Sequence, residues 1–233
     1  MSTVTFRVGS GEGREVTARH YAAAENAGEL AAATLILAHG AGAGQRHPFM
    51  VTLATGIAVL GFDVVTFDFP YMAEGRKLPD RAPVLEACYA AVVRDVLARV
   101  PSARRALFIG GKSMGGRMAT HLAASEGTLP IAGLVLLGYP LHPPGKPAQL
   151  RTAHLASIRR PILVVQGSRD TFGGPEELMP FFSRLDPPAT IHVVDGGDHS
   201  FKVARAGRDG QAAIERGICE TVANWMTAFR IRN

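Results

Sequence analysis

The sequence predicts one α/β domain over residues 1–233, built on a mostly parallel sheet of about eight strands with helices on both faces. Three observations favour this fold class. Short continuous apolar runs recur along the chain, longer amphipathic segments alternate with them, and turn-forming residues separate the two. Continuous apolar runs are typical of parallel strands, because both faces of such strands lie against helices. Their alternation with helices predicts that the strands join into one sheet.

The first two expected strands form an antiparallel pair. Residues 3–8 alternate polar and apolar side chains, as a half-buried strand does. Residues 16–23 supply a hairpin partner across a glycine-rich loop at 9–15. The apolar runs that follow predict the parallel strands, which lie at residues 34–40, 62–70, 106–111, 133–140, 161–170 and 190–199.

Helical segments separate most of these strands. Residues 82–100 show the pattern plainly, because apolar side chains recur there at helical spacing and form one face. That face consists of Leu85, Cys88, Val92 and Val96. The other expected helices cover residues 48–61, 115–125, 175–185 and 211–229.

Composition narrows the class of protein. Hydrophobic residues make up 47% and charged residues 19% of the 233 residues, so the chain can bury a substantial core without crosslinks. The net charge of +5 comes from dispersed basic residues. Because nucleic-acid-binding surfaces usually concentrate such residues among aromatic ones, we expect no nucleic-acid partner.

The two cysteines and the hydropathy of the chain predict its setting. Cys88 and Cys219 lie in helical patterns and in no CxxC pair, so a thiolate metal site is not expected. His39, His47 and Asp68 lack the spacing of metal ligands, and we expect neither metal nor cofactor. Without an apolar leader or membrane-length apolar run, we expect a soluble cytoplasmic monomer or homodimer with no membrane partner.

Gly111-Lys112-Ser113 raises the possibility of a phosphate-binding loop. A Walker A motif requires a glycine five residues before Gly111, and that position is Ala106. Residues 107–109 belong to a predicted strand, so no loop is left to surround a phosphate. The sequence therefore argues against this nucleotide site.

A dinucleotide fingerprint is the second nucleotide alternative, because glycines follow the strand at 34–40 and Asp68 ends the next strand. Gly-x-Gly-x-x-Gly starting at Gly40 or Gly42 requires glycine at 45 or 47. Those positions are Gln45 and His47, so the motif is broken in both registers.

Gly111-Lys112-Ser113-Met114-Gly115 fits a nucleophile elbow, in which a tight turn between strand and helix exposes a serine hydroxyl. The turn is strained, and small residues must stand two positions before and two after the serine. In parallel sheets, sites gather at the carboxyl ends of the strands. We therefore predict that Ser113 is a nucleophile.

Serine needs a base within hydrogen-bond reach, and the base needs an orienting carboxylate. His199 follows the last predicted strand and is the preferred base, with His142 as second choice. Asp170 ends the preceding strand and suits the carboxylate role. Asp195 and Asp198 are closer to the histidine in sequence, but a residue beside the histidine usually points elsewhere.

An acyl-transfer site also needs amide donors for the oxyanion. One donor is predicted to be the backbone amide of Met114, directly after the nucleophile. The other should come from the loop after the strand at 34–40, through the amide of Ala41 or Gly42. His47 lies in the same loop, and its role stays open.

The chain contains, in this order, a glycine-rich loop, Gly-x-Ser-x-Gly, an aspartate and a histidine. They lie within the motifs LAHGAGAG, FDFPYM, GGKSMGGRMA, GYPLHPPGKP, QGSRDTFG and GGDHSFK. These motifs resemble those of the α/β-hydrolase superfamily. More closely, they resemble the KANL3/Tex30-type α/β-hydrolase-like group, a distant relative of dienelactone hydrolases. The resemblance runs from about residue 34 to the C-terminus, and dienelactone hydrolases differ in having cysteine at the position of Ser113.

The resemblance implies a three-layer α/β-hydrolase fold with Ser113 as nucleophile, Asp170 as acid and His199 as base. It implies a serine hydrolase that acts on a carboxylic ester or thioester through an acyl-enzyme, with peptidase activity as a lesser option. The alternative is a hydrolase-fold interaction module without turnover. All three catalytic residue types stand at predicted strand ends, which favours the enzyme.

The substrate site is expected to be open. Only about twenty residues separate Tyr139 from Pro161, which is too few for a large helical lid. A small-molecule ester would enter a shallow site bordered by Tyr71, Met72, Leu141 and His142. Nearby loop charges either attract a carboxylate-bearing ester or are simply solvated, the more ordinary role; they are Arg76, Lys77, Arg81 and Lys146.

Overall fold

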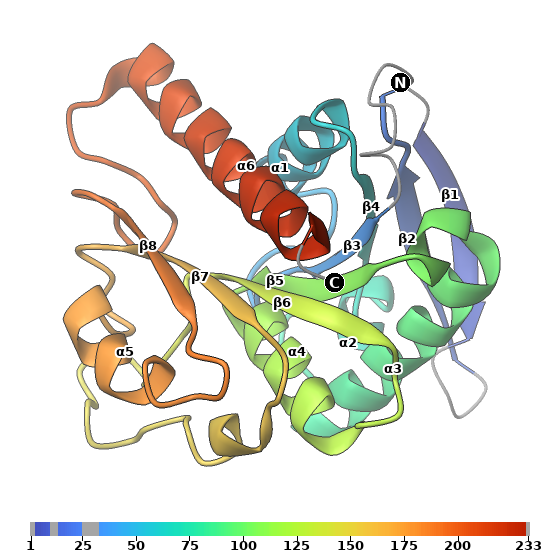
Figure 1. The fold of residues 1–233 in the computed structure, drawn as a ribbon, viewed down its shortest axis with the longest axis horizontal. Coiled ribbons are helices and arrows are strands. Elements are labelled where there is room, and N and C mark those ends of the chain that lie inside the picture. Colours follow the sequence, from blue (N-terminus) through green and yellow to red (C-terminus); the bar gives the residue numbers. More distant parts are fainter. Residues whose placement is uncertain (1–2, 10–13, 25–32, 232–233) are drawn as a thin grey trace.

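Eight strands form one sheet in the computed structural model, in the order β1-β2-β4-β3-β5-β6-β7-β8 (Figure 1). The structure describes residues 3–9, 14–24 and 33–231, with side chains to residue 228. Strands β3 to β8 run parallel, whereas β2 pairs antiparallel with both β1 and β4. The strands are β1 Thr3–Gly9, β2 Glu15–Tyr21, β3 Thr34–Ala38, β4 Asp63–Phe67, β5 Leu107–Lys112, β6 Ile131–Leu137, β7 Ile162–Gly167 and β8 Thr190–Val194.

Helices cover both faces of this sheet. Helices α1 (Pro48–Val59) and α6 (Gly207–Ile231) pack on one face, and α3, α4 and α5 pack on the other (Figure 1). The remaining helical elements are α2 Pro70–Ala73, α3 Ala82–Arg99, η2 Pro101–Arg104, α4 Met114–Ser125, η3 Leu155–Ser157 and α5 Pro175–Phe182. The predicted fold class is therefore confirmed.

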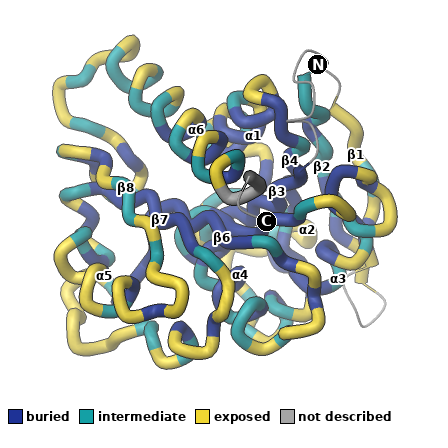
Figure 2. The backbone as a smooth tube through the Cα atoms, in the orientation of Figure 1, coloured by how far each residue is buried: buried dark blue, intermediate teal, exposed yellow. Residues whose placement is uncertain are grey.

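The core has two layers, because side chains of a strand alternate between the two faces of a sheet. In β3, Ile36 packs with the helices α3 and α4, while Leu35 and Leu37 pack with α1 and α6. Figure 2 shows the buried residues concentrated along the central strands. Burying one such side chain contributes about 1.5–3 kcal/mol, so the two layers together fix the positions of the strand ends.

The carboxyl ends of β3, β5, β7 and β8 bring four loops to the same edge of the sheet. The connection from β6 to β7 contains one short helical turn, η3, and no cap domain. The expected hairpin pairs β1 with β2, with Val8 opposite Val16, and its loop residues 10–13 lie outside the described residues.

Candidate active site

Ser113 stands on a sharp turn between β5 and α4. Its backbone has φ 51° and ψ −113°, a conformation that non-glycine residues rarely adopt. Strain of this kind costs about 1–3 kcal/mol and persists where surrounding structure enforces it. Here the Ser113 amide donates to the Leu137 carbonyl at 2.9 Å, and the Ser113 carbonyl accepts from the Arg117 amide at 3.0 Å.

Glycines at 111 and 115 let the end of β3 approach the turn closely. A Cβ atom at either position would press against the carbonyl oxygen of Ala38. At Gly115 it would also stand 2.7 Å from the His39 carbonyl oxygen. The Gly-x-Ser-x-Gly spacing thus has a steric reason in this fold: the neighbouring strand leaves no room for side chains.

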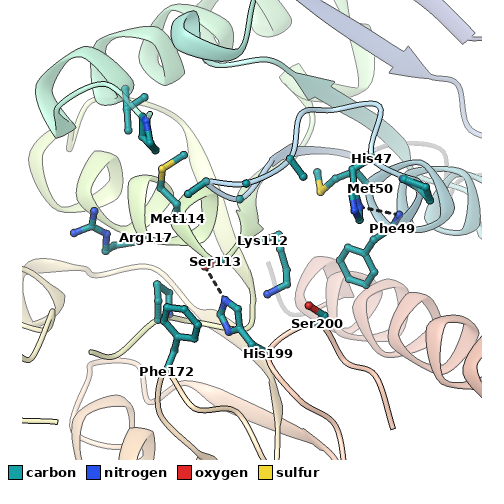
Figure 3. A pocket seen from close by; sticks show the side chains of 18 of the residues that line it. His47, Phe49, Met50, Lys112, Ser113, Met114, Arg117, Phe172, His199 and Ser200 are labelled. Carbon is teal, nitrogen blue, oxygen red and sulfur yellow. Dashed lines mark hydrogen bonds between the residues drawn. The ribbon is translucent and has the colours of Figure 1, made fainter. Parts of the chain in front are cut away.

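His199 and Asp170 complete a hydrogen-bonded chain that starts at Ser113. Figure 3 shows its first link, between His199 and Ser113. His199 Nε2 lies 2.9 Å from Ser113 Oγ, and His199 Nδ1 lies 2.8 Å from Asp170 Oδ2. Because a carboxylate only accepts, Nδ1 carries a proton and donates it to Asp170. Nε2 is then free to accept the proton of the serine hydroxyl.

The carboxylate of Asp170 is fully buried and held by two further donors. Gln166 Nε2 donates to Oδ2 at 2.8 Å, and the Phe172 amide donates to Oδ1 at 2.8 Å. Gln166 is itself fixed, since its Oε1 accepts from the Tyr139 amide at 2.8 Å. The Phe172 ring stacks on His199 with centroids 4.0 Å apart, so acid and imidazole are both held in one orientation.

The other residues considered for these roles have different partners. His142 is buried, with Nε2 at 3.1 Å from Glu177 Oε2 and Nδ1 at 2.9 Å from the Pro143 carbonyl. Asp195 accepts from the Ser168 hydroxyl, and Asp198 accepts from the amides of Ser200 and Lys202. These contacts shape the loops around the site instead of orienting His199.

The glycine-rich loop after β3 lies directly against the nucleophile. A Cβ at Gly40 would stand 3.6 Å from Ser113 Cβ, so the loop backbone touches the serine turn. Within the described part of the chain, the amides of Ala41, Gly42 and Met114 meet no hydrogen-bond acceptor. The three residues line the same pocket as Ser113, so their amides remain the candidate donors to a substrate oxyanion.

His39 and Tyr71 fix the shape of that loop. His39 Nδ1–H donates to the Gly40 carbonyl at 2.8 Å, and Nε2 accepts from the Phe69 amide at 3.0 Å. Burial lowers the pKa of His39, and the neutral ring matches these two contacts. The Tyr71 hydroxyl donates to the Ala41 carbonyl at 3.0 Å. Sequence reasoning missed the role of His39, although a histidine that ends an apolar strand was a visible signal.

Gln45 anchors the far end of the loop. Its amide and its Nε2 donate to the two carboxylate oxygens of Asp68 at 2.8 and 2.9 Å. The carboxylate of Asp68 is therefore already bound within the protein. Gln45, one of the two residues that break the dinucleotide fingerprint, is the residue that binds Asp68. His47 caps helix α1, where its Nδ1 accepts from the Phe49 amide at 3.3 Å.

A pocket of about 820 Å³ opens above Ser113, a volume typical of small-molecule sites. Its walls are mostly apolar and come from the loop after β3, from α1, α3, α4 and α6, from the loop before α3, and from the loops after β6, β7 and β8 (Figure 3). Its two carboxylates are Asp80 and Glu215. The apolar side chains that line it include Pro48, Phe49, Met50, Leu85, Met114 and Phe172.

The residues predicted to border this pocket do not line it, so that part of the prediction is wrong. Tyr71 and Leu141 are buried in the core, and His142 is turned toward Glu177. Met72 lies behind the glycine-rich loop, where it packs against Gly44. The strand ends carry these residues to the right edge of the sheet, but their side chains point into the protein.

The loop charges also lie elsewhere. Arg76 pairs with Glu74 at 2.7 Å and with Asp80 at 2.8 Å on the surface. Among the described residues that line the pocket, none of Arg76, Lys77, Arg81 and Lys146 appears. The interpretation of these four side chains as solvated surface charges is therefore favoured. Any attraction of an anionic substrate must come from other residues.

Lys112 precedes the nucleophile and buries its amine beside the site. In the described structure its Nζ has no hydrogen-bond partner and lies 5.3 Å from the centre of the Phe201 ring. Burial lowers the pKa of Lys112 to about 8, although Asp170 and Asp198 oppose the shift. A phosphate-binding role is excluded by position, since the residues before Lys112 form β5.

Replacing Lys112 with methionine is expected to stabilise the fold at pH 7. At pH 7 the Lys112 amine is protonated in both the folded and the unfolded wild type. The folded state therefore carries the whole free-energy cost of burying the charge, up to about 3 kcal/mol from the shift in pKa. Between pH 8 and 10.5 the folded lysine loses its proton first, so wild-type stability rises and the advantage of the variant shrinks.

Chemical unfolding of wild type and Lys112→Met at pH 7 and pH 10 measures this difference. The exposed Lys202 supplies the matched control, Lys202→Met, which should show no gain that depends on pH. A Lys112→Met protein that is less stable than wild type at pH 7 would contradict the account of Lys112 as a buried, unpartnered cation.

Among the described residues, no cluster of three or more His, Cys, Asp or Glu side chains is placed to hold a metal ion. In the same residues, no helix combines the length and apolar character that crossing a bilayer requires.

Comparison with known proteins supplies a family. The model of a family described as "Alpha/beta hydrolase domain" matches residues 31–227. A serine hydrolase without a lid from Xanthomonas campestris superposes with a TM-score of 0.73 at 16% identity, covering 96% of this chain and 95% of that one.

Two further solved structures share the fold at similarly low identity. A dienelactone hydrolase from Anabaena variabilis has a TM-score of 0.73 at 17% identity, with 97% of each chain covered. An esterase from Pyrococcus furiosus has a TM-score of 0.75 at 16% identity, covering 99% of this chain and 91% of that one.

Proposed function

Because this chain belongs to the alpha/beta hydrolase domain family, we propose that it is a serine hydrolase that cleaves a small carboxylic ester or thioester. The observation that carries the proposal is the chain of hydrogen bonds from Ser113 through His199 to Asp170, at the floor of a mostly apolar pocket. Esterases and a dienelactone hydrolase among the structures of the same fold support the choice of reaction.

In the first half of the reaction, Ser113 Oγ attacks the carbonyl carbon while His199 Nε2 takes the hydroxyl proton. Asp170 stabilises the imidazolium that forms. The negative charge that develops on the carbonyl oxygen is received by the amide of Met114 and that of Ala41 or Gly42. The tetrahedral intermediate then collapses, and His199 gives its proton to the departing alcohol or thiol.

The second half repeats these roles with water. His199 takes a proton from water, the resulting hydroxide attacks the acyl carbon, and the acid leaves as Ser113 regains its proton. Each amide donor to the oxyanion is worth about 3 kcal/mol of the barrier in comparable sites.

Within the family, we place the chain in the KANL3/Tex30-type group. The motifs LAHGAGAG, GGKSMGGRMA and GGDHSFK, by which the sequence resembles that group, support this placement. A serine nucleophile separates the chain from dienelactone hydrolases that use cysteine. The connection between β6 and β7 carries no cap domain, which suits a substrate that reaches the pocket from solvent.

A fluorophosphonate probe tests the proposal, since such probes modify only activated serines. Wild-type protein should be labelled, Ser113→Ala should not, and His199→Ala should be labelled far more slowly because the hydroxyl loses its base. Mass spectrometry of the labelled peptide identifies the site. A folded wild type that stays unlabelled would sink the enzyme hypothesis and favour an interaction module that keeps the hydrolase fold.

A further inference from the structure

Two arginines line the same pocket as Ser113 and belong to no step of the mechanism above. Arg117 lies one helical turn after the nucleophile, about 6 Å along α4. Arg151 comes from the connection between β6 and β7. Its amide donates to the Leu141 carbonyl at 2.8 Å, and its carbonyl accepts from the Tyr139 hydroxyl at 2.6 Å. Both side chains therefore start from well-fixed backbone.

Neither arginine has an acidic partner among the residues that the structure describes. In the described part of the protein, no carboxylate lies within ion-pair distance of Arg117 or Arg151. The Nε of Arg117 is buried and meets no acceptor there. A buried donor without an acceptor is unfavourable, and a ligand that accepts from this Nε would remove the penalty. Figure 3 shows Arg117 on the Met114 side of the pocket, away from His47 and Phe49.

The groups around Arg117 leave its charge uncompensated. Burial lowers the pKa of Arg151, and the charge of Arg117 lowers it further. His154 has its pKa lowered to about 4, first by burial and then by His121 and Arg117. Glu86 faces this cluster but is engaged by His121 Nδ1 at 2.8 Å. Two like charges thus share one wall of the pocket, and the two carboxylates that also line it, Asp80 and Glu215, form no ion pair with either arginine in the described structure.

We propose that Arg117 and Arg151 form an anion subsite that selects esters or thioesters carrying a second, free carboxylate. The inference rests on the proposed hydrolase function and adds the substrate class. A guanidinium binds a carboxylate through two parallel hydrogen bonds, and a partly desolvated wall strengthens them. With Arg117 one turn from Ser113, the free carboxylate belongs a few bonds from the scissile carbonyl, as in a half-ester of a short dicarboxylic acid.

Matched ester pairs test the subsite. On the acyl side, mono-(4-nitrophenyl) glutarate is compared with its methyl ester, and release of nitrophenolate is followed for both. On the alcohol side, 4-acetoxybenzoate is compared with methyl 4-acetoxybenzoate. Wild type should prefer the free carboxylate in one of these pairs by about 10- to 100-fold in kcat/KM, the range of a charge-assisted hydrogen bond. The pair that shows the preference tells which side of the ester faces the arginines.

Arginine variants show where the preference originates. Arg117→Gln and Arg151→Gln should each remove most of the ratio between the two esters, mainly through a higher KM for the carboxylate. Arg151→Lys should keep part of it. Arg94→Gln is the matched control, because Arg94 pairs with Glu126 and neither residue lines the pocket, and it should leave the ratio unchanged. Raising the salt concentration should weaken the wild-type preference only slightly, because partly buried charges are screened much less than exposed ones.

The outcomes separate the two proposals. Equal rates for both members of each pair, with Ser113 still labelled by the probe, would overturn the subsite and leave the hydrolase. A preference for the free carboxylate that persists in the Arg117→Gln/Arg151→Gln double variant would overturn the subsite as well. If neither ester is cleaved but Ser113 is labelled, free glutarate must slow the labelling of wild type more than that of the double variant. No labelling and no cleavage would remove the hydrolase proposal and the subsite with it.

Discussion

Ser113→Ala is expected to lower kcat for an ester substrate by about 10⁴- to 10⁶-fold, because no other group can form the acyl-enzyme. The residual rate would come from the amides of the glycine-rich loop and Met114, which still stabilise an oxyanion when water attacks directly. Steady-state kinetics with a nitrophenyl ester measures the loss. Binding of the substrate should change little, since the hydroxyl contributes few ground-state contacts.

Ser183→Ala is the matched control for that variant. Ser183 is an exposed serine after α5, and its hydroxyl donates to the Met179 carbonyl at 2.7 Å, far from any role in the reaction. Its kinetics should equal those of wild type. If Ser113→Ala retained more than about a tenth of wild-type turnover, the nucleophile would have to be another residue.

Asp170→Asn is expected to lower kcat by about 10⁴-fold while leaving the fold intact. Asp170 Oδ2 now accepts from both His199 Nδ1 and Gln166 Nε2, at 2.8 Å each. An asparagine that turns its nitrogen toward His199 presents a donor to Nδ1. The ring then moves its proton to Nε2, which can no longer accept from Ser113. Rates measured across pH, with circular dichroism for the fold, test this result.

Asp195→Asn makes the same chemical change close to the histidine in sequence. The carboxylate of Asp195 accepts from the Ser168 hydroxyl at 3.3 Å and lies on the surface. Its loss should alter turnover by no more than a few-fold. A comparable loss in the two variants would mean that both carboxylates act through a shared effect on the loops, and would argue against Asp170 as the specific partner of His199.

Much of the fold was predictable because burial on both faces leaves a plain trace in the sequence. The strands β3, β5, β6 and β7 are almost entirely apolar, with Thr34, Lys112 and Gln166 as the polar exceptions. In the helices between them, apolar side chains recur at helical spacing. Element ends were less predictable. The run at 190–199 stops being strand at Val194, because Gly196 and Gly197 turn the chain back toward β7.

The sequence predicted only those residues of the candidate site whose positions follow from the carboxyl ends of the strands. Ser113, Asp170 and His199 were placed by chain order, and the structure brings them into hydrogen-bond contact. The direction of a side chain in a loop depends on its packing, so Tyr71 and Leu141 were expected in the pocket and lie in the core. Gln166 had a usable signal, since a single polar residue inside an apolar strand needs a buried partner.

The packing of α6 bears on how the protein is made. Helix α6 follows all eight strands in the chain, yet it covers the face of the sheet that holds Leu35 and Phe108. During synthesis, chains elongate at about 5–20 residues per second, so the side chains on this face remain uncovered by α6 for several seconds. A nascent chain that stops before residue 207 would expose those side chains to other chains. Premature termination should therefore yield insoluble product rather than a partly active enzyme.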